Sequence, residues 1–419
     1  MKTIGIIGLG YVGLPLALMF HSKGFPVVGI DIDPDKLALY HKGRSYLSTI
    51  EDKVITELKM SDRFTFSDNY SLISKVDVII ICVPTPLSEK EEPELVYIFS
   101  AMSSMLPYLK KDQLIVLESS TYPGTTEDEI VPFLQKNGWA PGEDILVGYS
   151  PERIDPGNTT HAHQDIPKII SGINDQSLNE IKAVYEQIFK TLIPVSTPRV
   201  AEITKLVENT QRFINISFIN EISKLCHELD IDIWEVISAA GTKPYGFTPY
   251  YPSSGIGGHC IPVDPLYLKW KADQHNFKLN FVELAKKVND IQPTYIVQRV
   301  NELMLMNQTN QSEAGGILVV GLTYKPNVND LRESRPLKVF ELLLNKHDQV
   351  HFYDPYVKEF TLNGEVHSSQ DLDRFEQYDL VLILSDHDRI NYDRILQSAK
   401  LIFDTKNCYK KNYPNVKRL

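Results

Sequence analysis

The sequence predicts an α/β protein with two doubly wound parallel sheets, which are joined by a long central helix and a helical connector. Short, continuous apolar runs alternate with amphipathic stretches over the first third of the chain, a pattern typical of parallel sheets with helices on both faces. Residues 200–231 have the pattern of one helix without an internal Gly or Pro. From residue 317 onward, the alternation of strands and helices resumes.

These changes of pattern divide the chain of 419 residues into three expected domains. This number agrees with a soft prior of ~150 residues per domain. The first sheet takes its buried strands from apolar runs at residues 3–9, 26–32, 76–83 and 113–119. The expected linker before the second sheet is the polar segment MNQTNQSEAGG at residues 306–316. We expect the domains at residues 1–199, 200–305 and 312–419.

The composition is that of a folded, acidic protein. Its 42% of hydrophobic residues excludes intrinsic disorder, and its net charge of −11 argues against general nucleic-acid binding. The cysteines at positions 82, 226, 260 and 408 form no C-x-x-C pair, which indicates a reducing compartment. The N-terminus has the pattern of a strand, and no apolar run reaches the ~20 residues that span a bilayer. We therefore expect a cytoplasmic protein without membrane or nucleic-acid partners.

The first apolar strand is followed by a turn with G-x-G-x-x-G spacing, Gly8-Leu9-Gly10-Tyr11-Val12-Gly13. In such a turn the first glycine allows the tight bend, the second lets the backbone approach a pyrophosphate, and the third lets the helix pack on the strand. Asp31 ends the second strand, where a carboxylate binds ribose hydroxyls and disfavours a 2′-phosphate. The turn, including Tyr11 and Val12, and Asp31 together predict a Rossmann-like domain that binds NAD.

Three further strand ends carry polar residues. Thr85 follows the third apolar run, Thr121 follows the fourth, and the pair Glu152-Arg153 follows the strand ILVGYS. The carboxyl ends of parallel strands meet at the edge where open α/β sheets bind ligands, so Thr85 and Thr121 are candidate cofactor contacts. Taken alone, the segments around Thr85 and Thr121 are each better explained by ordinary turn chemistry.

The segment GGHCIPVDP at residues 257–265 is the strongest candidate for catalysis. Its paired glycines allow close approach of the backbone to a ligand, and Cys260 is the only cysteine in such a loop. A thiol near a nicotinamide suggests covalent oxidation of an aldehyde through a thiohemiacetal and a thioester, with Asp264 orienting or activating water. A dyad with His259 is disfavoured because adjacent side chains seldom face each other, and no ligand set for a metal is evident.

Polar side chains on the remaining elements complete the candidate set. Lys205 and Asn209 lie one turn apart on the long helix, where they could stabilise a developing alkoxide, although a solvated helix face is the alternative. Lys325 and Arg332 follow the first strand of the second sheet, which lacks the glycine fingerprint. We therefore do not expect a second dinucleotide there, but both cations could bind phosphates.

Over nearly its whole length the chain resembles the UDP-glucose/GDP-mannose dehydrogenases, a family of nucleotide-sugar 6-dehydrogenases. The resemblance rests on ordered motifs: GLGYVGLP, VPTP, SST, SPER, AEITKLVEN, GGHCIPVDP and GLTYKPNVNDLRES. It implies a two-step, four-electron oxidation of a sugar C6 hydroxyl to a carboxylate, with two NAD consumed. It also implies a homodimer formed through the central helix, and a UDP-sugar-binding role for the C-terminal domain.

The resemblance also implies a role for each matching residue. Cys260 would be the nucleophile, Lys205 and Asn209 would stabilise oxyanions, and Thr121 would help hold the hydrolytic water. Asp264 and Glu152 would activate water and serve acid/base chemistry, and Arg332 would contact the cofactor. The expected contacts of the nucleotide sugar are Glu152, Arg153, Lys205, Asn209, Tyr250, Gly257 and Lys325.

The loop around the cysteine resembles the N-acetylhexosamine branch of the family, because GGHC is followed by Val-Asp-Pro. The stretch KPYGFTPYYP at residues 243–252 is similar to that of enzymes acting on UDP-N-acetylglucosamine, the expected substrate, for surface polysaccharide. The pair Ser253-Ser254 departs from the Gly-Pro that is common there. UDP-N-acetylmannosamine and UDP-glucose are the alternative substrates. A non-catalytic sensor and a one-step hydroxy-acid dehydrogenase are the alternative classes of protein.

Overall fold

The structure is a computed structural model that describes residues 1–47, 49–153, 162–258, 260–307, 316–371 and 375–419. It divides into two compact units. Unit 1 comprises Met1–Glu208 and Val263–Lys278, and unit 2 comprises Asn209–Pro262 and Leu279–Leu419. Most of the expected linker at 306–316, and the expected boundary at residue 312, lie outside the described residues. The three expected domains stay a prediction.

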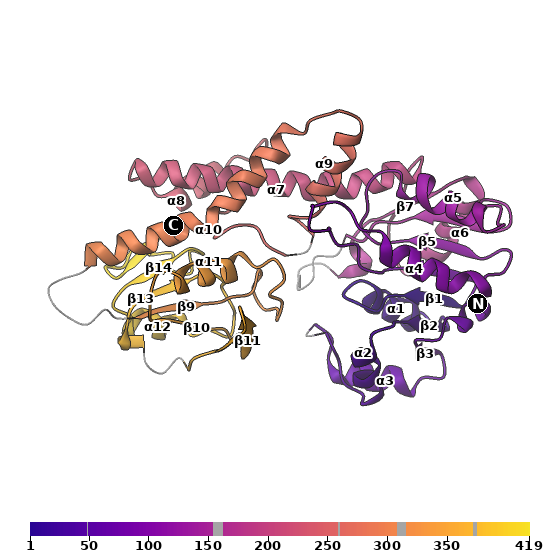
Figure 1. Cartoon of the computed structure of the whole chain (residues 1–419), viewed down its shortest axis with the longest axis horizontal. Helices are drawn as coiled ribbons and strands as arrows, with labels where there is room; N and C mark the ends of the chain where they lie inside the picture. Colours follow the sequence, from indigo (N-terminus) through magenta and orange to yellow (C-terminus); the bar gives the residue numbers. More distant parts are fainter. Residues whose placement is uncertain (48, 154–161, 259, 308–315, 372–374) are drawn as a thin grey trace. The chain divides into compact units, whose positions relative to one another are not determined.

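Unit 1 is built on a sheet whose strands follow the order β3-β2-β1-β4-β5-β6-β7-β8 (Figure 1). The strands that the apolar runs predicted are β1 (Ile4–Ile7), β2 (Val27–Ile30), β4 (Val78–Ile81), β5 (Leu114–Leu117) and β6 (Leu146–Tyr149). These five strands pair in parallel and are buried along their whole length. The sequence analysis did not assign β3 (Phe64–Ser67), β7 (Lys168–Gly172) and β8 (Leu192–Pro194), of which β7 runs antiparallel to β6.

Helices cover both faces of this sheet, which explains why its central strands are apolar on every residue. One face packs against α1 (Gly13–Ser22), α3 (Asp52–Met60) and α6 (Asp175–Tyr185). The other packs against α4 (Val96–Met105) and α5 (Val131–Lys136). The strand order reverses at β1, whose neighbours are β2 and β4. Open α/β sheets bind ligands beyond the carboxyl ends of strands at such a switch point.

The predicted long helix is α7, which runs from Pro198 to Glu228. It ends three residues earlier than the expected limit because the backbone of Asp230 turns to φ 55°, and the Ile231 amide donates back to the carbonyl of Cys226 at 2.8 Å. Three further helices lie between this point and the second sheet: α8 (Ile233–Ala240), α9 (Asp264–Gln274) and α10 (Asn280–Asn307).

Unit 2 contains a smaller parallel sheet with the strand order β10-β9-β13-β14-β15. The alternation predicted from residue 317 onward corresponds to β9 (Gly316–Val320), β10 (Val350–Tyr353), β13 (Tyr378–Ile383) and β14 (Ile402–Asp404). That pattern did not indicate the strand β15 (Val416–Arg418) or the hairpin of β11 (Glu359–Leu362) and β12 (Glu365–Ser368). Helices α10 and α11 (Arg335–Leu344) cover one face, and α12 (Tyr392–Ser398) covers the other. The predicted fold class is therefore confirmed.

Candidate active site

In the glycine turn after β1, the fold itself requires glycine at two positions, whereas the third glycine has free space beside it. The backbone of Gly8 has φ +89°, and a Cβ there would lie 2.8 Å from the carbonyl oxygen of Cys82. A Cβ on Gly13 would lie 1.9 Å from the carbonyl oxygen of Gly8. At Gly10, in contrast, no atom lies within 4 Å of the Cβ position. The middle glycine therefore leaves room for a pyrophosphate to approach the backbone amides, as NAD requires.

Asp31 follows β2 and faces this turn. Its Oδ2 accepts a hydrogen bond from the Leu9 amide at 2.8 Å, and its Oδ1 accepts one from the Asp33 amide at 3.1 Å. Lys36 Nζ lies 2.7 Å from Oδ2, an ion pair that the sequence analysis missed. The carboxylate thus fixes the glycine turn and lies where ribose hydroxyls of a dinucleotide are bound. The turn and Asp31 together fit NAD.

The loops after β4 and β5 pack against α9 within unit 1. The hydroxyl of Thr85 donates to the Ser120 carbonyl at 2.7 Å, and the Thr85 carbonyl accepts a hydrogen bond from the hydroxyl of Tyr267 on α9. The ring of Tyr122 lies 4.7 Å from that of Trp270, also on α9. These contacts place the helix that begins at Asp264 on the same loops that carry Thr85 and Thr121.

Glu202 is a buried carboxylate that joins α7 to the Thr121 loop, and the sequence analysis missed it. It accepts hydrogen bonds from the amides of Gly124 (2.6 Å) and Thr126 (2.8 Å) and from the Thr126 hydroxyl (2.7 Å). Burial raises the pKa of Glu202 to about 6, although these hydrogen bonds oppose the shift. Glu202 and Lys205 lie three residues apart on one helix face. An acid at this spacing from Lys205 was the sequence feature that could have indicated Glu202 as part of the site.

Thr121, Lys205 and Asp264 are all buried polar side chains of unit 1, as the predicted roles require. Thr121 is fully buried, and its hydroxyl hydrogen-bonds with that of Thr125. Asp264 is the first residue of α9 and is 2% exposed, at the helix end where the macrodipole stabilises a carboxylate. Polar groups are rarely buried without partners or function, so their burial favours a site over a solvated surface. Their catalytic roles remain predictions.

Glu152 belongs to a buried cluster of charges at the carboxyl end of β6. Lys168 Nζ lies 2.8 Å from Glu118 Oε2 and 3.1 Å from Glu152 Oε2, and the Tyr185 hydroxyl donates to Glu118. Burial raises the pKa of Glu118, while the two carboxylates raise the pKa of Lys168 against the effect of its own burial. A protonated Lys168 therefore holds Glu152 in place. Apolar strand patterns gave no sign of Lys168 inside β7.

Arg153 forms a two-pronged ion pair with Glu208 of α7. Its Nε and Nη2 donate to the two carboxylate oxygens at 3.1 and 2.6 Å, and its Nη1 donates to the Pro167 carbonyl at 2.7 Å. These bonds tie the loop after β6 to α7. The predicted contact of Arg153 with the nucleotide sugar remains a prediction.

The cysteine loop is held in unit 2 by amide side chains of two helices. Asn220 of α7 accepts from the Ser253 amide at 2.8 Å, and Gln292 of α10 donates to the Ser253 carbonyl at 2.8 Å. Asn289 makes two hydrogen bonds to the backbone of Ile256, at 2.6 and 3.1 Å. The buried loop backbone is thus paired as a strand would be. It leads to Cys260, which is exposed and is the only exposed member of the four cysteines, all of which are described.

The paired glycines of this loop pack against the loop that follows β9. A Cβ on Gly257 would lie 2.5 Å from the carbonyl oxygen of Glu333, and one on Gly258 would lie 2.6 Å from the ring of Tyr324. The close approach that was expected toward a ligand is here made by protein atoms. The predicted substrate contact of Gly257 stays a prediction, and His259 lies outside the described residues.

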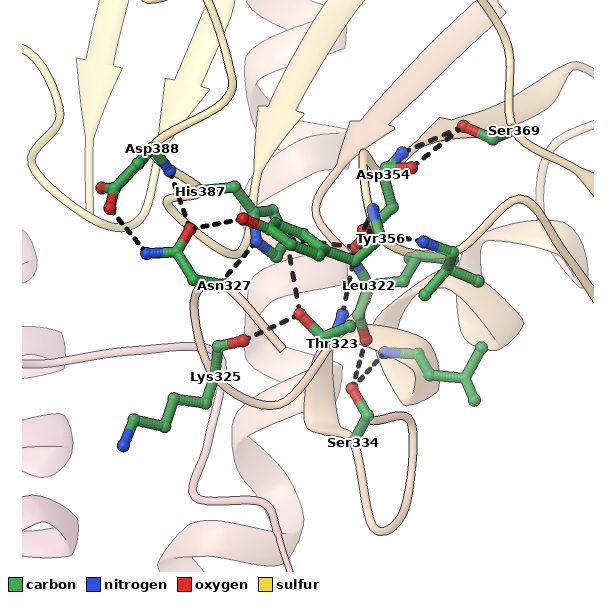
Figure 2. Close-up of polar contacts among 12 residues, drawn as sticks. Leu322, Thr323, Lys325, Asn327, Ser334, Asp354, Tyr356, Ser369, His387 and Asp388 are labelled. Carbon is green, nitrogen blue, oxygen red and sulfur yellow. Dashed lines mark hydrogen bonds and ion pairs between the residues drawn. The ribbon is translucent and has the colours of Figure 1, made fainter. Parts of the chain in front are cut away.

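The loop after β9 carries the two predicted phosphate-binding cations, Lys325 and Arg332 (Figure 2 labels Lys325). The hydroxyl of Thr323 donates to the backbone carbonyl of Lys325 at 2.9 Å. Arg332 is half-exposed and pairs with Asp330, with 2.6 Å between Nη2 and Oδ2. Tyr250, another predicted ligand contact in unit 2, packs against the apolar cluster around α8.

The candidate residues thus fall into two groups, one in each unit. Unit 1 holds the glycine turn with Asp31, Thr85, Thr121, Glu152, Arg153, Lys205 and Asp264. Unit 2 holds Asn209, Tyr250, Gly257, Cys260, Lys325 and Arg332. The chain itself links the groups, since Asn209 follows Lys205 by one turn of α7 and Asp264 follows Cys260 by four residues.

A largely parallel sheet with a glycine turn and an acid after its second strand, an exposed cysteine and a second parallel sheet fit an NAD-dependent dehydrogenase. The chain belongs to the UDP-glucose/GDP-mannose dehydrogenase family. Residues 2–192 match the NAD binding domain of that family, residues 199–291 its central domain, and residues 318–411 its UDP binding domain. The family resemblance and the NAD prediction are therefore confirmed, as is the prediction of an enzyme.

Individual relatives point to two sugars. The chain is 37% identical over 356 residues to a UDP-N-acetyl-D-glucosamine 6-dehydrogenase of Pseudomonas aeruginosa, covering 84% of this chain and 83% of that protein. It is 34% identical over 418 residues to a UDP-N-acetyl-D-mannosamine dehydrogenase of Methanocaldococcus jannaschii, covering 97% and 92%. A solved UDP-N-acetyl-mannosamine dehydrogenase of Staphylococcus aureus superposes with a TM-score of 0.84 at 32% identity, covering 100% and 98%.

The described part of the chain has neither a membrane-spanning helix nor a cluster of metal ligands. None of the helices in the described ranges is both long and apolar enough to cross a membrane. No group of three or more His, Cys, Asp or Glu side chains in the same ranges is arranged to hold a metal ion.

Proposed function

We propose that the protein oxidises the C6 hydroxyl of a UDP-N-acetylhexosamine to a carboxylate for surface polysaccharide biosynthesis. The proposed sugar is UDP-N-acetylglucosamine. The observation that carries the proposal is the exposed Cys260 on a loop that packs against Tyr324, beside Lys325 of the UDP binding domain. In an NAD-dependent oxidation, a nucleophilic thiol allows an aldehyde to be carried on to an acid through a thioester. The relative from Pseudomonas aeruginosa supports the choice of sugar.

The glycine turn and Asp31 would hold the dinucleotide, by backbone amides at the pyrophosphate and by the carboxylate at the ribose. When bound, NAD accepts one hydride from C6 in each of the two oxidations. Thr85, whose hydroxyl is fixed by Ser120, and Arg332 are the further proposed cofactor contacts. Lys325 would place its charge against the diphosphate of the nucleotide sugar, with Tyr250, Gly257 and Arg153 as additional substrate contacts.

The buried Lys205 and Asn209 would stabilise the negative oxygen at C6 as the hydroxyl loses its proton and again when the thiol adds. The Cys260 sulfur attacks the aldehyde carbon, its proton passes to solvent or a neighbouring base, and a thiohemiacetal forms. Loss of the second hydride from C6 leaves a thioester on Cys260.

Hydrolysis of that thioester requires a positioned water. Thr121 would hold it, and Asp264 and Glu152 would take its proton as its oxygen attacks the carbonyl carbon. The C–S bond then breaks, the acid leaves, and the thiol takes up the proton. Lys168 keeps Glu152 in place for this role through its 3.1 Å ion pair.

The proposal is tested by incubating the purified protein with NAD and a panel of UDP-sugars while following NADH absorbance. We expect UDP-N-acetylglucosamine to have the highest kcat/KM, about tenfold or more above its C2 epimer. A Cys260→Ser variant should form no acid, whereas Cys408→Ser should retain it. Absence of turnover with every UDP-sugar would contradict the proposal, and full acid formation by Cys260→Ser would remove the thioester.

UDP-N-acetylmannosamine is the second candidate substrate. It is supported by the relative from Methanocaldococcus jannaschii, which aligns over more of the chain, and by the Staphylococcus aureus enzyme. A higher kcat/KM for the mannosamine epimer in the same panel would favour this candidate.

We also propose a cytoplasmic homodimer formed through the central helices. Large apolar side chains on the unit 2 part of α7 and on α10 are more than half exposed: Phe218, Leu225, Phe281, Leu284 and Ile291. Contiguous exposed apolar side chains are typical of an interface. Light scattering should give twice the mass of one chain, and a Phe218→Glu/Leu225→Glu variant should give the mass of one. A monomeric wild type would contradict the proposal.

A further inference from the structure

A fully buried histidine lies beside the loop that carries Lys325. His387 comes shortly after β13, whereas Lys325 follows β9, the neighbouring strand in the sheet of unit 2. Figure 2 shows the histidine ring between Asn327 on one side and Asp354 on the other. None of these three neighbours of Lys325 has a role in the proposed reaction.

The two ring nitrogens of His387 have different partners. Nδ1 lies 3.0 Å from the backbone nitrogen of Asn327, whereas Nε2 lies 3.1 Å from Asp354 Oδ2 and 3.4 Å from Thr323 Oγ1. A backbone N–H can only donate, so Nδ1 must be the unprotonated acceptor. Nε2 therefore carries the proton and donates it to the carboxylate. The two bonds select one tautomer of His387.

Asp354 is equipped to keep that tautomer. Its Oδ2 accepts hydrogen bonds from the Leu322 amide (2.8 Å) and the Thr323 amide (3.4 Å) besides His387, and its Oδ1 accepts from the amides of Tyr356 (2.8 Å) and Val357 (3.2 Å). Burial alone would raise the pKa of Asp354, but the bonds from His387, Leu322 and Tyr356 hold it below its usual value. The nearer group facing Nε2 is therefore a carboxylate, which only accepts, and the farther one, the Thr323 hydroxyl, uses its proton on the Lys325 carbonyl.

The Lys325 loop is held on both sides of the lysine. Before it, the Thr323 hydroxyl donates to the Lys325 carbonyl at 2.9 Å. After it, Asn327 adopts φ +63°, a conformation that side-chain-bearing residues rarely take. Asn327 also exchanges two hydrogen bonds with Asp388, at 2.8 Å from its Nδ2 and 3.0 Å to its Oδ1. Such a backbone persists only where its surroundings over-determine it, and the bond to His387 Nδ1 is the one that fixes its N–H.

We propose that His387 is a positioning residue, whose Nδ1 fixes the backbone of Asn327 and so holds Lys325 in the conformation that binds the diphosphate of the nucleotide sugar. This inference rests on the proposed role of Lys325. It predicts a selective effect on the nucleotide sugar. The glycine turn and Asp31, which are proposed to bind NAD, belong to unit 1, and Arg332, the proposed cofactor contact in unit 2, is paired with Asp330 rather than with Asn327 or His387.

Two variants separate the two bonds of the histidine. In His387→Asn the amide oxygen can replace Nδ1 as acceptor for Asn327, while in His387→Gln the amide nitrogen can replace Nε2 as donor to Asp354. We expect His387→Gln to raise the KM for the UDP-sugar and the Kd for UDP about tenfold, as expected for a buried amide left without its acceptor. His387→Asn should stay within about twofold of the wild type. Both should keep the KM for NAD.

The comparison between variants distinguishes positioning from a general structural role, which would weaken both variants and both substrates together. Equal effects in the two variants, or a parallel rise in the KM for NAD, would overturn the proposal. A Lys325→Ala variant distinguishes failure of the proposed role of Lys325 from failure of the inference on His387. If it leaves the Kd for UDP unchanged, the proposed role of Lys325 fails. If it raises that Kd while His387→Gln does not, only the inference on His387 fails.

A measurement on the unmodified protein covers the case in which a variant does not fold. NMR of isotopically labelled protein should show a nitrogen–nitrogen coupling across the bond from the Asn327 amide to His387 Nδ1, with the ring proton on Nε2. A proton on Nδ1 would overturn the proposal.

Discussion

The corner between β1 and β2 in unit 1 and the corner between β9 and β10 in unit 2 are built with the same hydrogen bonds. The Gly8 amide donates to the Ile30 carbonyl at 2.8 Å, and the Gly321 amide donates to the Tyr353 carbonyl at 2.9 Å. In each corner the next amide donates to a carboxylate that ends the neighbouring strand, at 2.8 Å to Asp31 and at 2.8 Å to Asp354.

The two corners differ in what else reaches the carboxylate. Asp31 accepts hydrogen bonds from two backbone amides and pairs with the partly exposed Lys36. Asp354 accepts four backbone amides and the buried His387, so it has no capacity for a ribose. The first corner continues at once into α1 at Gly13, whereas the second continues into a longer loop that carries Lys325 before α11 begins. The same backbone hydrogen bonds therefore leave the Asp31 carboxylate able to bind a ligand in unit 1 and place the Lys325 cation near the corner in unit 2.

The largest expected effect is the difference in stability between variants that lack one or the other carboxylate. Asp354→Ala leaves buried amides and His387 without an acceptor, and we expect it to destabilise unit 2 by about 4 kcal/mol. Asp31→Ala should cost only about 1–2 kcal/mol, because Lys36 can return to water. Thermal unfolding followed by calorimetry measures both variants. Equal destabilisation in the two variants would show that the two carboxylates contribute equally to the free energy of unfolding, which would contradict this prediction.

A second contrast concerns buried carboxylates that hold loops. The pKa of Asp354 is lowered, whereas that of Glu202 is raised to about 6, so the Thr121 loop should respond to pH. Between about pH 4 and pH 7 the folded state binds more protons at Glu202 than the unfolded state does, so the free energy of unfolding should fall by about 2 kcal/mol as pH rises through this range. Glu202→Gln should remove this slope, and the exposed Glu186→Gln should keep it. An unchanged slope in Glu202→Gln would contradict the assignment.

The smallest expected effect concerns which ligand each corner binds, NAD in unit 1 or the nucleotide sugar in unit 2. Asp31→Ala should raise the KM for NAD about tenfold, equivalent to ~1.4 kcal/mol, because hydrogen bonds from ribose hydroxyls to a carboxylate are lost. Calorimetric titration should give an unchanged Kd for UDP. A weaker affinity for UDP in this variant would mean that the two corners do not bind their ligands independently.

The fold was largely predictable because its signals are local. Buried parallel strands appear as apolar runs, the glycine turn has fixed spacing, and α7 shows an uninterrupted helical pattern. The strands β7 and β15 and the hairpin were missed because they are short or carry charge, as Lys168 does inside β7.

The candidate site was predictable only in its motifs. The partners that hold those motifs lie far away in the sequence: Glu118 and Lys168 around Glu152, Glu202 below the Thr121 loop, and His387 behind Lys325. Nothing in the local pattern of these residues distinguishes them from core or surface positions, because their function depends on tertiary contacts. The glycines at 257–258 show the same limit, since their spacing revealed a close approach but not that Tyr324 and Glu333 make it.

In the proposed reaction, one chain carries a sugar alcohol through an aldehyde to an acid by means of Cys260. This reaction is tested most directly by counting NADH formed per molecule of UDP-N-acetylglucosamine consumed, with the sugar limiting and NAD in excess. We expect two NADH and one uronic acid for each sugar. One NADH for each sugar, with an aldehyde as the product, would contradict it.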